Sequence, residues 1–162
     1  MPKAIERRLL TKGVDCAERE AMLNLLLAAD HVRQRFERIC APHGITQPQY
    51  NVLRILRGAH PDGHPRCEII RRLIEHSPDV TRLVDRLERM GLVERTRGAE
   101  DRRLSLTRIT QGGLDLLTKM EADVAANEAW FASLLPCGES EALSQLCERI
   151  YGPDLERANE GT

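Results

Sequence analysis

The stretch SPDVTRLVDRLERMG, residues 77–91, carries the signals of a short helix at both of its ends. Ser77 belongs to the residue types favoured at helix N-caps, and Pro78 suits a first turn, where its missing N–H removes no helical hydrogen bond. Gly91 suits the left-handed position that follows a last turn. We therefore expect one helix that begins near Ser77 and ends just before Gly91.

This helix has two different faces. Apolar residues recur at steps of three and four, a spacing that predicts one stripe against a core: Val80, Leu83, Val84, Leu87 and Met90. The opposite face is polar and carries Asp79, Thr81, Arg82, Asp85, Arg86 and Arg89. Arginine and aspartate at such spacings are typical of a solvated, salt-bridged surface, so the polar face alone indicates no function.

The segment after the helix predicts a β-hairpin. LVERTR (92–97) changes to the period of a strand, GAEDR (98–102) is typical of a turn, and RLSLTRI (103–109) reads as the returning strand. The alternation places Leu104 and Leu106 on one side of that strand. The hairpin would carry a charged tip, formed by Asp101, Arg102 and Arg103.

Three helices are expected before the opening stretch. Apolar periodicity predicts a long helix over 17–40, a shorter one from the N-cap Thr46 to Gly58, and a short one over 67–76. GAHPDGHP (58–65) is rich in turn residues and predicts a loop. The residues of the 67–76 helix assigned to the core are Cys67, Ile70, Leu73 and Ile74.

Two more helices are expected after the hairpin. Thr110 can cap the first, which continues until LLPCG (134–138), and the second covers about 139–157. The fold class is therefore mainly α with a small β-hairpin wing. Two short helices joined by a tight turn and followed by a hairpin match a winged helix-turn-helix, whose second helix can enter the major groove of DNA.

In that fold the polar face of the 77–91 helix would contact DNA. Arg82 and Arg86 lie one turn apart and can reach guanine O6 and N7 or bridge phosphates. Thr81 can meet a base edge, while Asp79 and Asp85 would orient the arginines or reject wrong sequences.

Phosphate and minor-groove contacts are expected at either side of this face. Ser77 lies at the helix start, where free N–H groups can bind a backbone phosphate. Arg102 and Arg103 at the hairpin tip can reach an adjacent minor groove, and Asp101 can hold one of them by a charge-assisted bond.

The distribution of charge supports this placement. The whole chain is nearly neutral, with 24 Lys and Arg against 25 Asp and Glu. Residues 66–108, however, hold eleven basic and eight acidic residues, a net charge of +3, which leaves −4 for the remainder. Positive charge is thus concentrated in the segment that would face DNA.

Residues 77–113, SPDVTRLVDRLERMGLVERTRGAEDRRLSLTRITQGG, resemble the signature of the MarR family of bacterial transcription regulators. The order and length of the flanking helices extend the similarity over roughly residues 18–155, and ITQPQYNVLRIL (45–56) is a second local match. Because more than thirty consecutive residues follow the pattern, the resemblance is specific.

The resemblance implies a homodimer in which terminal helices interlock and two winged helices bind a pseudo-palindromic operator on double-stranded DNA. By position, Thr81, Arg82 and Arg86 would face the major groove, and Arg103, braced by Asp101, the minor groove. Most members repress and release DNA when a ligand binds. The corresponding regions here are 1–45 and 111–162 for dimerisation and 46–110 for DNA binding.

The residues favour a small aromatic or anionic effector over the other signals used in this family. The positions of the reactive cysteine and tyrosines of the peroxide sensors hold Met22, Leu26 and Phe36, and no histidine pair follows His76 as in the zinc sensors. The remaining polar candidates flank the junction of the first two helices and are His43, Tyr50 and Arg54, each of which can equally be structural.

Metal and redox chemistry are poorly supported. His60, His64 and Cys67 have tolerable ligand spacing but no obvious fourth partner, so neither a metal nor a cofactor is expected. Five scattered cysteines without a CxxC pair predict reduced thiols rather than a disulfide framework. Cys16 and Cys40, at the two ends of the long helix, are expected to be buried or incidental.

Other classes of protein fit less well. No Ser-His-Asp order, glycine-rich phosphate loop or HExxH motif indicates an enzyme. The longest apolar run, LLLAA (25–29), is far below the roughly 20 residues of a membrane span, and no signal peptide is evident, so we expect a cytoplasmic protein without a membrane partner. A ligand-binding or protein-interaction module of the same fold that does not read DNA stays open as the alternative.

Overall fold

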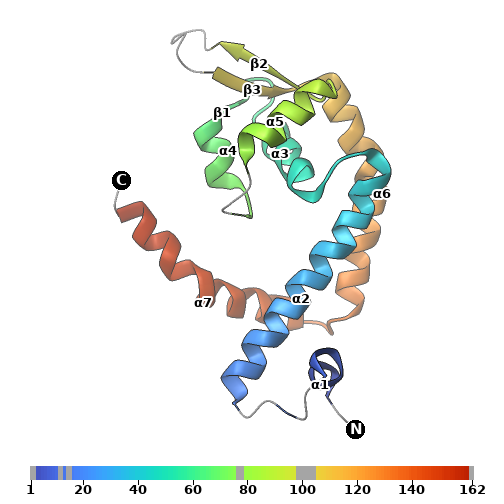
Figure 1. Cartoon of the computed structure of the whole chain (residues 1–162), viewed down its shortest axis with the longest axis vertical. Coiled ribbons are helices and arrows are strands. Elements are labelled where there is room, and N and C mark those ends of the chain that lie inside the picture. Colours follow the sequence, from blue (N-terminus) through green and yellow to red (C-terminus); the bar gives the residue numbers. More distant parts are fainter. Residues whose placement is uncertain (1–2, 11–12, 14–15, 76–78, 98–104, 161–162) are drawn as a thin grey trace. The chain divides into compact units, whose positions relative to one another are not determined.

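The computed structural model describes residues 3–10, 13, 16–75, 79–97 and 105–160 of the chain (Figure 1). The chain forms two compact units, Met1–Met120 and Glu121–Thr162, and the division falls inside a long helix. As predicted, the architecture is mainly helical with a small antiparallel sheet. In chain order the elements are α1 (Ala4–Leu9), α2 (Ala17–Cys40), the short 3-10 helix η1 (Ala41–His43), α3 (Gln47–Gly58), β1 (His64–Pro65), α4 (Arg66–Arg72), α5 (Val80–Arg89), β2 (Val93–Arg97), β3 (Ser105–Ile109), α6 (Gln111–Ser133) and α7 (Glu139–Glu160).

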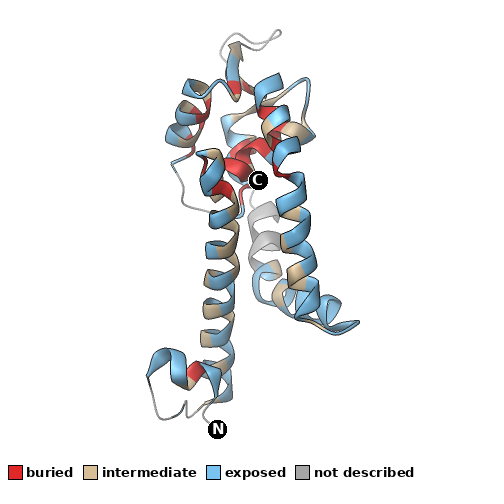
Figure 2. Ribbon diagram, turned by 90° about the vertical axis from the view of Figure 1, so that its right-hand side faces the viewer, coloured by how far each residue is buried: buried red, intermediate tan, exposed pale blue. Residues whose placement is uncertain are grey.

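The core of the first unit is built on α3. Val52, Leu53 and Leu56 are fully buried there. Helix α3 contacts α4 and α5, whose Ile69 and Leu87 are also 0% exposed. Buried residues gather around α3, α5 and the sheet, whereas most of α2 shows intermediate or exposed residues (Figure 2). The winged part of the unit therefore contains most of its hydrophobic core.

The long helix α2 and its junction with α3 agree with the sequence-based expectation. α2 ends at Cys40, and after η1 the chain turns at Gly44, which has φ 72°. Thr46 is the N-cap of α3, and its backbone N–H donates to Gln49 Oε1 at 2.9 Å. Glu37 of α2 accepts a 2.7 Å hydrogen bond from the Gln47 N–H, which fastens the end of one helix to the start of the next.

The helix predicted over 67–76 is shorter than expected. α4 ends at Arg72, because the backbone at Leu73 has already become extended, with φ −70° and ψ 141°. The following segment reaches α5 within a few residues. Part of that connection, residues 76–78, lies outside the described residues.

The core stripe assigned to this helix was also largely wrong. Ile69, at 0% exposure, and Leu73, at 6%, face the core, whereas Ile70 is 43% and Ile74 73% exposed, and Cys67 is exposed as well. Two adjacent isoleucines in a helix of two turns permit two different apolar stripes. The sequence therefore did not decide which of them packs inward.

The start of α5 differs from the prediction by two residues. The N-cap is Asp79 rather than Ser77, and its Oδ1 accepts a hydrogen bond from the Arg82 N–H at 3.2 Å. Aspartate caps helices as well as serine does, so residue type alone could not separate the two positions. The end of the helix is as predicted, since Gly91 has φ 71°.

The hairpin is confirmed, but the sheet has a third strand. β2 and β3 pair antiparallel from Val93↔Ile109 to Arg97↔Ser105, and β1 adds to the other edge of β3 through His64↔Thr107. Residues 58–65 are thus not all loop. Gly63 makes this pairing possible because it has φ 79° and a Cβ there would lie 2.4 Å from the Thr107 carbonyl oxygen.

The inward side of β3 is also different from the prediction. Thr107 and Ile109 are each 4% exposed, while Leu106 is only half-buried; Leu104 lies outside the described residues. The Thr107 side chain lies at the hollow beside Val80 and Val84 of α5, so a polar residue occupies an inward position that periodicity alone would assign to solvent.

The helix after the sheet begins as predicted at Thr110. Its Oγ1 accepts from the Gly113 N–H at 3.2 Å and donates to the Gly91 carbonyl at 2.6 Å. A Cβ at Gly113 would lie 2.3 Å from the Leu92 carbonyl oxygen. Because glycine has no Cβ, the start of α6 can pack closely against the segment that follows α5.

The second unit holds the end of α6 and the predicted final helix α7. Large apolar side chains on α7 are exposed: Leu143 at 37%, Leu146 at 54%, Ile150 at 63% and Tyr151 at 52%. None of the helices in the described part of the chain is both long and apolar enough to cross a membrane.

Candidate nucleic-acid interface

The helix α5 is fixed on one face and open on the other. Val80, Val84 and Leu87 are buried as predicted, while Leu83 is half-buried and Met90, at 39% exposure, lies at the edge of the stripe. The opposite face presents the exposed residues Thr81, Arg82, Arg86 and Arg89. A buried apolar stripe therefore holds a row of polar groups toward solvent.

Arg82 and Arg86 lie one turn apart on this open face, as predicted. The side chain of Arg82 is 88% exposed and its Nε pairs with Asp79 Oδ2 at 3.1 Å, so Asp79 both caps the helix and orients an arginine. Within the described part of the chain, the side chain of Arg86 makes no hydrogen bond or ion pair. Arg89 instead donates to the carbonyl of Asp85 in its own helix at 3.3 Å.

Asp85 also orients an arginine, but one on the sheet. Arg95 of β2 bonds Asp85 through Nη2 at 2.5 Å and Glu88 through Nη1 at 2.9 Å. This clamp of Arg95, Asp85 and Glu88 joins α5 to the wing, and its three side chains are 35 to 43% exposed. Two carboxylates compensate the charge of Arg95, which is therefore a structural rather than a free cation.

Two arginines at this surface were not singled out from the sequence. The first is Arg95, and the second is Arg66 at the start of α4, whose Nη1 donates to Thr81 Oγ1 at 3.3 Å. Both contacts join residues of different elements. Local periodicity carries no information about contacts between distant segments. The signals that could have indicated these two arginines are the position of Arg95 within its strand and the place of Arg66 at the start of its helix.

A hollow of about 330 Å³ lies between α5 and the sheet. Its lining combines apolar side chains of α5 with two arginines, an aspartate and three hydroxyl groups: Arg66, Val80, Thr81, Val84, Asp85, Arg95, Ser105 and Thr107. Elements that are far apart in the sequence therefore meet at one polar depression beside the open face of α5.

The other residues predicted to contact DNA belong to the helix start and the hairpin tip. Ser77, Asp101, Arg102 and Arg103 lie outside the described residues. The register of β2 and β3 places Arg97 opposite Ser105. These are the last described residue before the tip and the first one after it.

Two of the three proposed effector residues lie together at the α2–α3 junction. Arg54 Nη1 donates to the Tyr50 hydroxyl at 3.3 Å, and the Tyr50 ring contacts Phe36 of α2 with centroids 4.9 Å apart. His43 is half-buried on η1 and, among the described residues, forms no hydrogen bond with either of them. The structure thus brings Tyr50 and Arg54 together and leaves His43 apart.

The thiols differ strongly in exposure. Cys40 is fully buried, and burial raises the pKa of its thiol to about 12. Cys67 and Cys137 are exposed, and Cys16 donates to Glu18 Oε2 at 2.7 Å. Among the residues that the structure describes, no three His, Cys, Asp or Glu side chains are placed to hold a metal ion.

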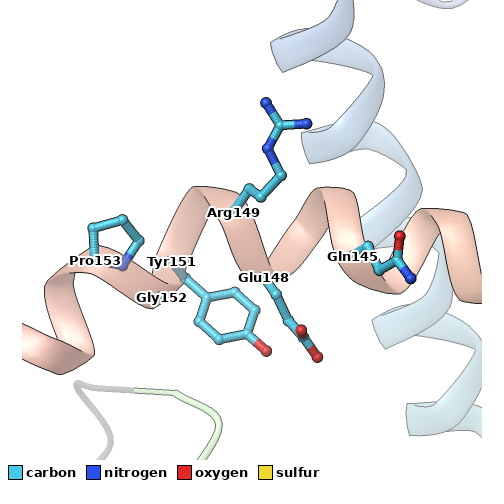
Figure 3. Close-up of a pocket in the computed structure, with 6 residues that line it drawn as sticks. All are labelled: Gln145, Glu148, Arg149, Tyr151, Gly152 and Pro153. Atoms are coloured by element: carbon cyan, nitrogen blue, oxygen red, sulfur yellow. The ribbon is translucent and has the colours of Figure 1, made fainter.

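Two further hollows lie away from α5. One of about 590 Å³ follows α7 and is lined by six residues of that helix alone, among them Glu148, Arg149 and Tyr151 (Figure 3). Since Figure 3 shows its side chains projecting in different directions from a single helix, this is an open surface. The other, of about 440 Å³, lies between α1 and α2 and includes Arg8, Asn24 and His31.

Comparisons with known proteins agree on one family. Residues 45–105 match the model of the MarR family. The chain is 36% identical to a MarR transcription factor from Planctomyces limnophilus, with a TM-score of 0.65 over 84% of this chain and 98% of that one. It is 29% identical to the transcriptional repressor CouR bound to a 23-mer DNA duplex, with a TM-score of 0.72 over 86% of this chain and 99% of that one. The PcaV transcriptional regulator from Streptomyces coelicolor, solved with its natural ligand, is 26% identical, with a TM-score of 0.68 over 88% and 98%.

Proposed function

Because this chain belongs to the MarR family of transcription regulators, we propose that α5 and the wing bind a specific sequence in double-stranded DNA and that the bound protein represses transcription. The observation that carries this proposal is the open face of α5, where Arg82 is 88% exposed and Arg86 has no partner among the described residues. The match to CouR in its DNA complex supports the same use of the fold.

The arginines of the open face suit base recognition. A guanidinium can donate two hydrogen bonds to O6 and N7 of guanine, and Arg82 and Arg86 project from adjacent turns. Thr81, next to them, offers a methyl and a hydroxyl to a base edge. We assign these three residues to the major groove, and Arg102 and Arg103, with Asp101 as a brace and Ser77 at the helix start, to the neighbouring backbone and minor groove.

A homodimer would place two such helices on one operator. The exposed apolar residues Leu143, Leu146 and Ile150 recur at helical spacing on α7 and would be covered in a dimer. A two-fold symmetric protein recognises a pseudo-palindromic sequence, with half-sites about 10 base pairs apart. We expect this regulator to act in the cytoplasm, and the proposed function needs no catalytic group.

A small aromatic or anionic effector would release the DNA. Tyr50 and Arg54 offer a phenol and a guanidinium beside Phe36, a combination that suits a planar acid, and His43 is the third candidate. The ligand complex of PcaV supports effector control in a protein of this fold. Titrating such acids into the protein–DNA complex, with Arg54→Ala as the variant, would test this assignment.

The direct test of the proposed function is a binding titration at several salt concentrations. The DNA upstream of the regulator's own gene is compared with a scrambled duplex of the same composition. A DNA reader should prefer the upstream sequence and lose affinity steeply with salt, log K falling by about 0.9 for each phosphate neutralised. Equal binding to both duplexes, or a flat salt response, would instead favour a ligand-binding or protein-interaction module that does not read DNA.

A further inference from the structure

We infer that Arg66 holds a phosphate of the DNA backbone at the hollow between α5 and the sheet, so that α4 contributes affinity while α5 contributes sequence preference. This inference rests on the proposed function and assigns a contact to a residue outside the recognition helix and the wing. It follows from the position of Arg66, from the charges around it and from the hydroxyl groups beside it.

The position of Arg66 is set by two elements. It is the first residue of α4, it is exposed, and its Nη1 donates to the hydroxyl of Thr81 in the first turn of α5. This bond holds the guanidinium beside the DNA-facing end of α5. In a helix-turn-helix the first helix crosses the DNA backbone while the second enters the groove, so a side chain at this place meets phosphates rather than bases.

Among the described residues of the lining, Arg66 is the cation that no carboxylate compensates. Arg95 lines the same hollow, but Asp85 and Glu88 already bind both of its terminal nitrogens. Among the described residues no carboxylate pairs with Arg66, and Asp85, the one acid in the lining, is engaged by Arg95. The hollow can therefore accept an anion without first breaking an ion pair.

The remaining polar groups of the lining fit a phosphate. Ser105 at the start of β3 offers a hydroxyl donor, and the planar guanidinium of Arg66 has further N–H groups beside the one that Thr81 accepts. A phosphate oxygen at the mouth of the hollow would thus have donors from α4 and β3. Thr81 holds the guanidinium in place and keeps its own hydroxyl hydrogen for the base edge.

The test separates a phosphate contact from a base contact. Arg66→Ala should weaken binding to the upstream sequence and to a scrambled duplex by the same factor, roughly tenfold, because a charge-assisted hydrogen bond is lost in both complexes. The slope of log K against log salt should become shallower by about 0.9 for each protomer. Arg66→Lys, which retains the charge, should keep most of that slope.

Arg71→Ala is the matched control, since Arg71 is an exposed arginine of the same helix that pairs with Glu68. The inference is overturned if Arg66→Ala leaves the salt slope of the wild type unchanged, if both variants lower it equally, or if Arg66→Ala mainly reduces the preference for one sequence. A wild-type protein that shows no sequence preference would instead contradict the proposed function. Thermal unfolding of each variant establishes that the fold is retained.

Discussion

At the scale of single residues, the proposed DNA-binding surface contains arginines of three kinds. Arg82 and Arg86 point outward from α5, Arg66 is held by a hydroxyl, and Arg95 is bound by two acids. Their identical side chains therefore have different roles, which are set by their partners. The sequence identified the first pair because helical spacing places them on one face. It could not identify the other two, whose partners come from separate elements.

Arg82→Ala tests the assignment to base reading. If Arg82 contacts a guanine, specific binding should weaken by roughly 1–3 kcal/mol while binding to scrambled DNA changes much less. Arg33→Ala is a suitable control, because Arg33 forms the same kind of i, i+3 pair with Asp30 on α2. Fluorescence anisotropy with both duplexes measures the two affinities. An equal loss on both would refute base reading by Arg82.

Cys40 allows a test of burial by chemistry. With a thiol pKa of about 12, Cys40 should stay protonated and unreactive toward iodoacetamide at pH 8, whereas the exposed Cys67 is alkylated. Burial disfavours the thiolate in the folded state but not in the unfolded state. The free energy of unfolding should therefore be unaffected by Cys40 below the ordinary thiol pKa of 9.0 and should fall as the pH rises from 9.0 toward 12. Mass spectrometry of labelled peptides reads the reactivity. Rapid labelling of Cys40 in the folded protein would contradict its burial.

At the scale of elements, capping residues and periodicity predicted most of the fold. Helix α2, the N-cap Thr46 and the hairpin were all predictable, because each depends on signals within a few residues. The errors occurred at α4, where two adjacent isoleucines allow two packing faces, and at β1, a two-residue strand formed only by pairing with β3. In both cases the outcome depends on contacts between distant segments.

The clamp between α5 and β2 predicts a coupled effect of Arg95→Ala. Its partly exposed ion pairs should contribute only about 1 kcal/mol or less to the free energy of unfolding. Removing Arg95 also leaves Asp85 and Glu88 uncompensated beside the DNA, so affinity for any duplex should fall. The double variant Glu88→Gln/Arg95→Ala should recover part of that affinity. Urea unfolding and DNA titration measure the two effects, and unchanged DNA affinity in Arg95→Ala would show that Asp85 and Glu88 do not lie beside bound DNA.

The third strand depends on Gly63. Gly63→Ala should lower the free energy of unfolding by about 1–3 kcal/mol, because alanine is strained at positive φ and its Cβ would collide with the Thr107 carbonyl. Gly58→Ala is the matched control, since a Cβ there meets no atom within 4 Å. Urea denaturation of both variants compares the two sites. Similar stabilities would show that β1 does not pack closely on β3.

At the scale of the whole molecule, operator binding is expected to require two protomers. The double variant Leu146→Glu/Ile150→Glu places charges on the exposed apolar face of α7 and should convert a dimer to monomers. Loss of the second binding module should lower operator affinity by about 10²-fold or more. Ser144→Glu, a change at an exposed polar position of α7, is the control. Light scattering gives the mass of each variant, and a dimer that survives the double substitution would exclude this face from the interface.

The central claim is sequence-specific DNA binding by a symmetric pair of α5 helices, and selection from a pool of random duplexes tests it most directly. Repeated rounds of binding should enrich one pseudo-palindromic sequence with half-sites centred about 10 base pairs apart. The variant Arg82→Ala/Arg86→Ala should fail to enrich it. A pool that stays random after selection with the wild-type protein would contradict the claim.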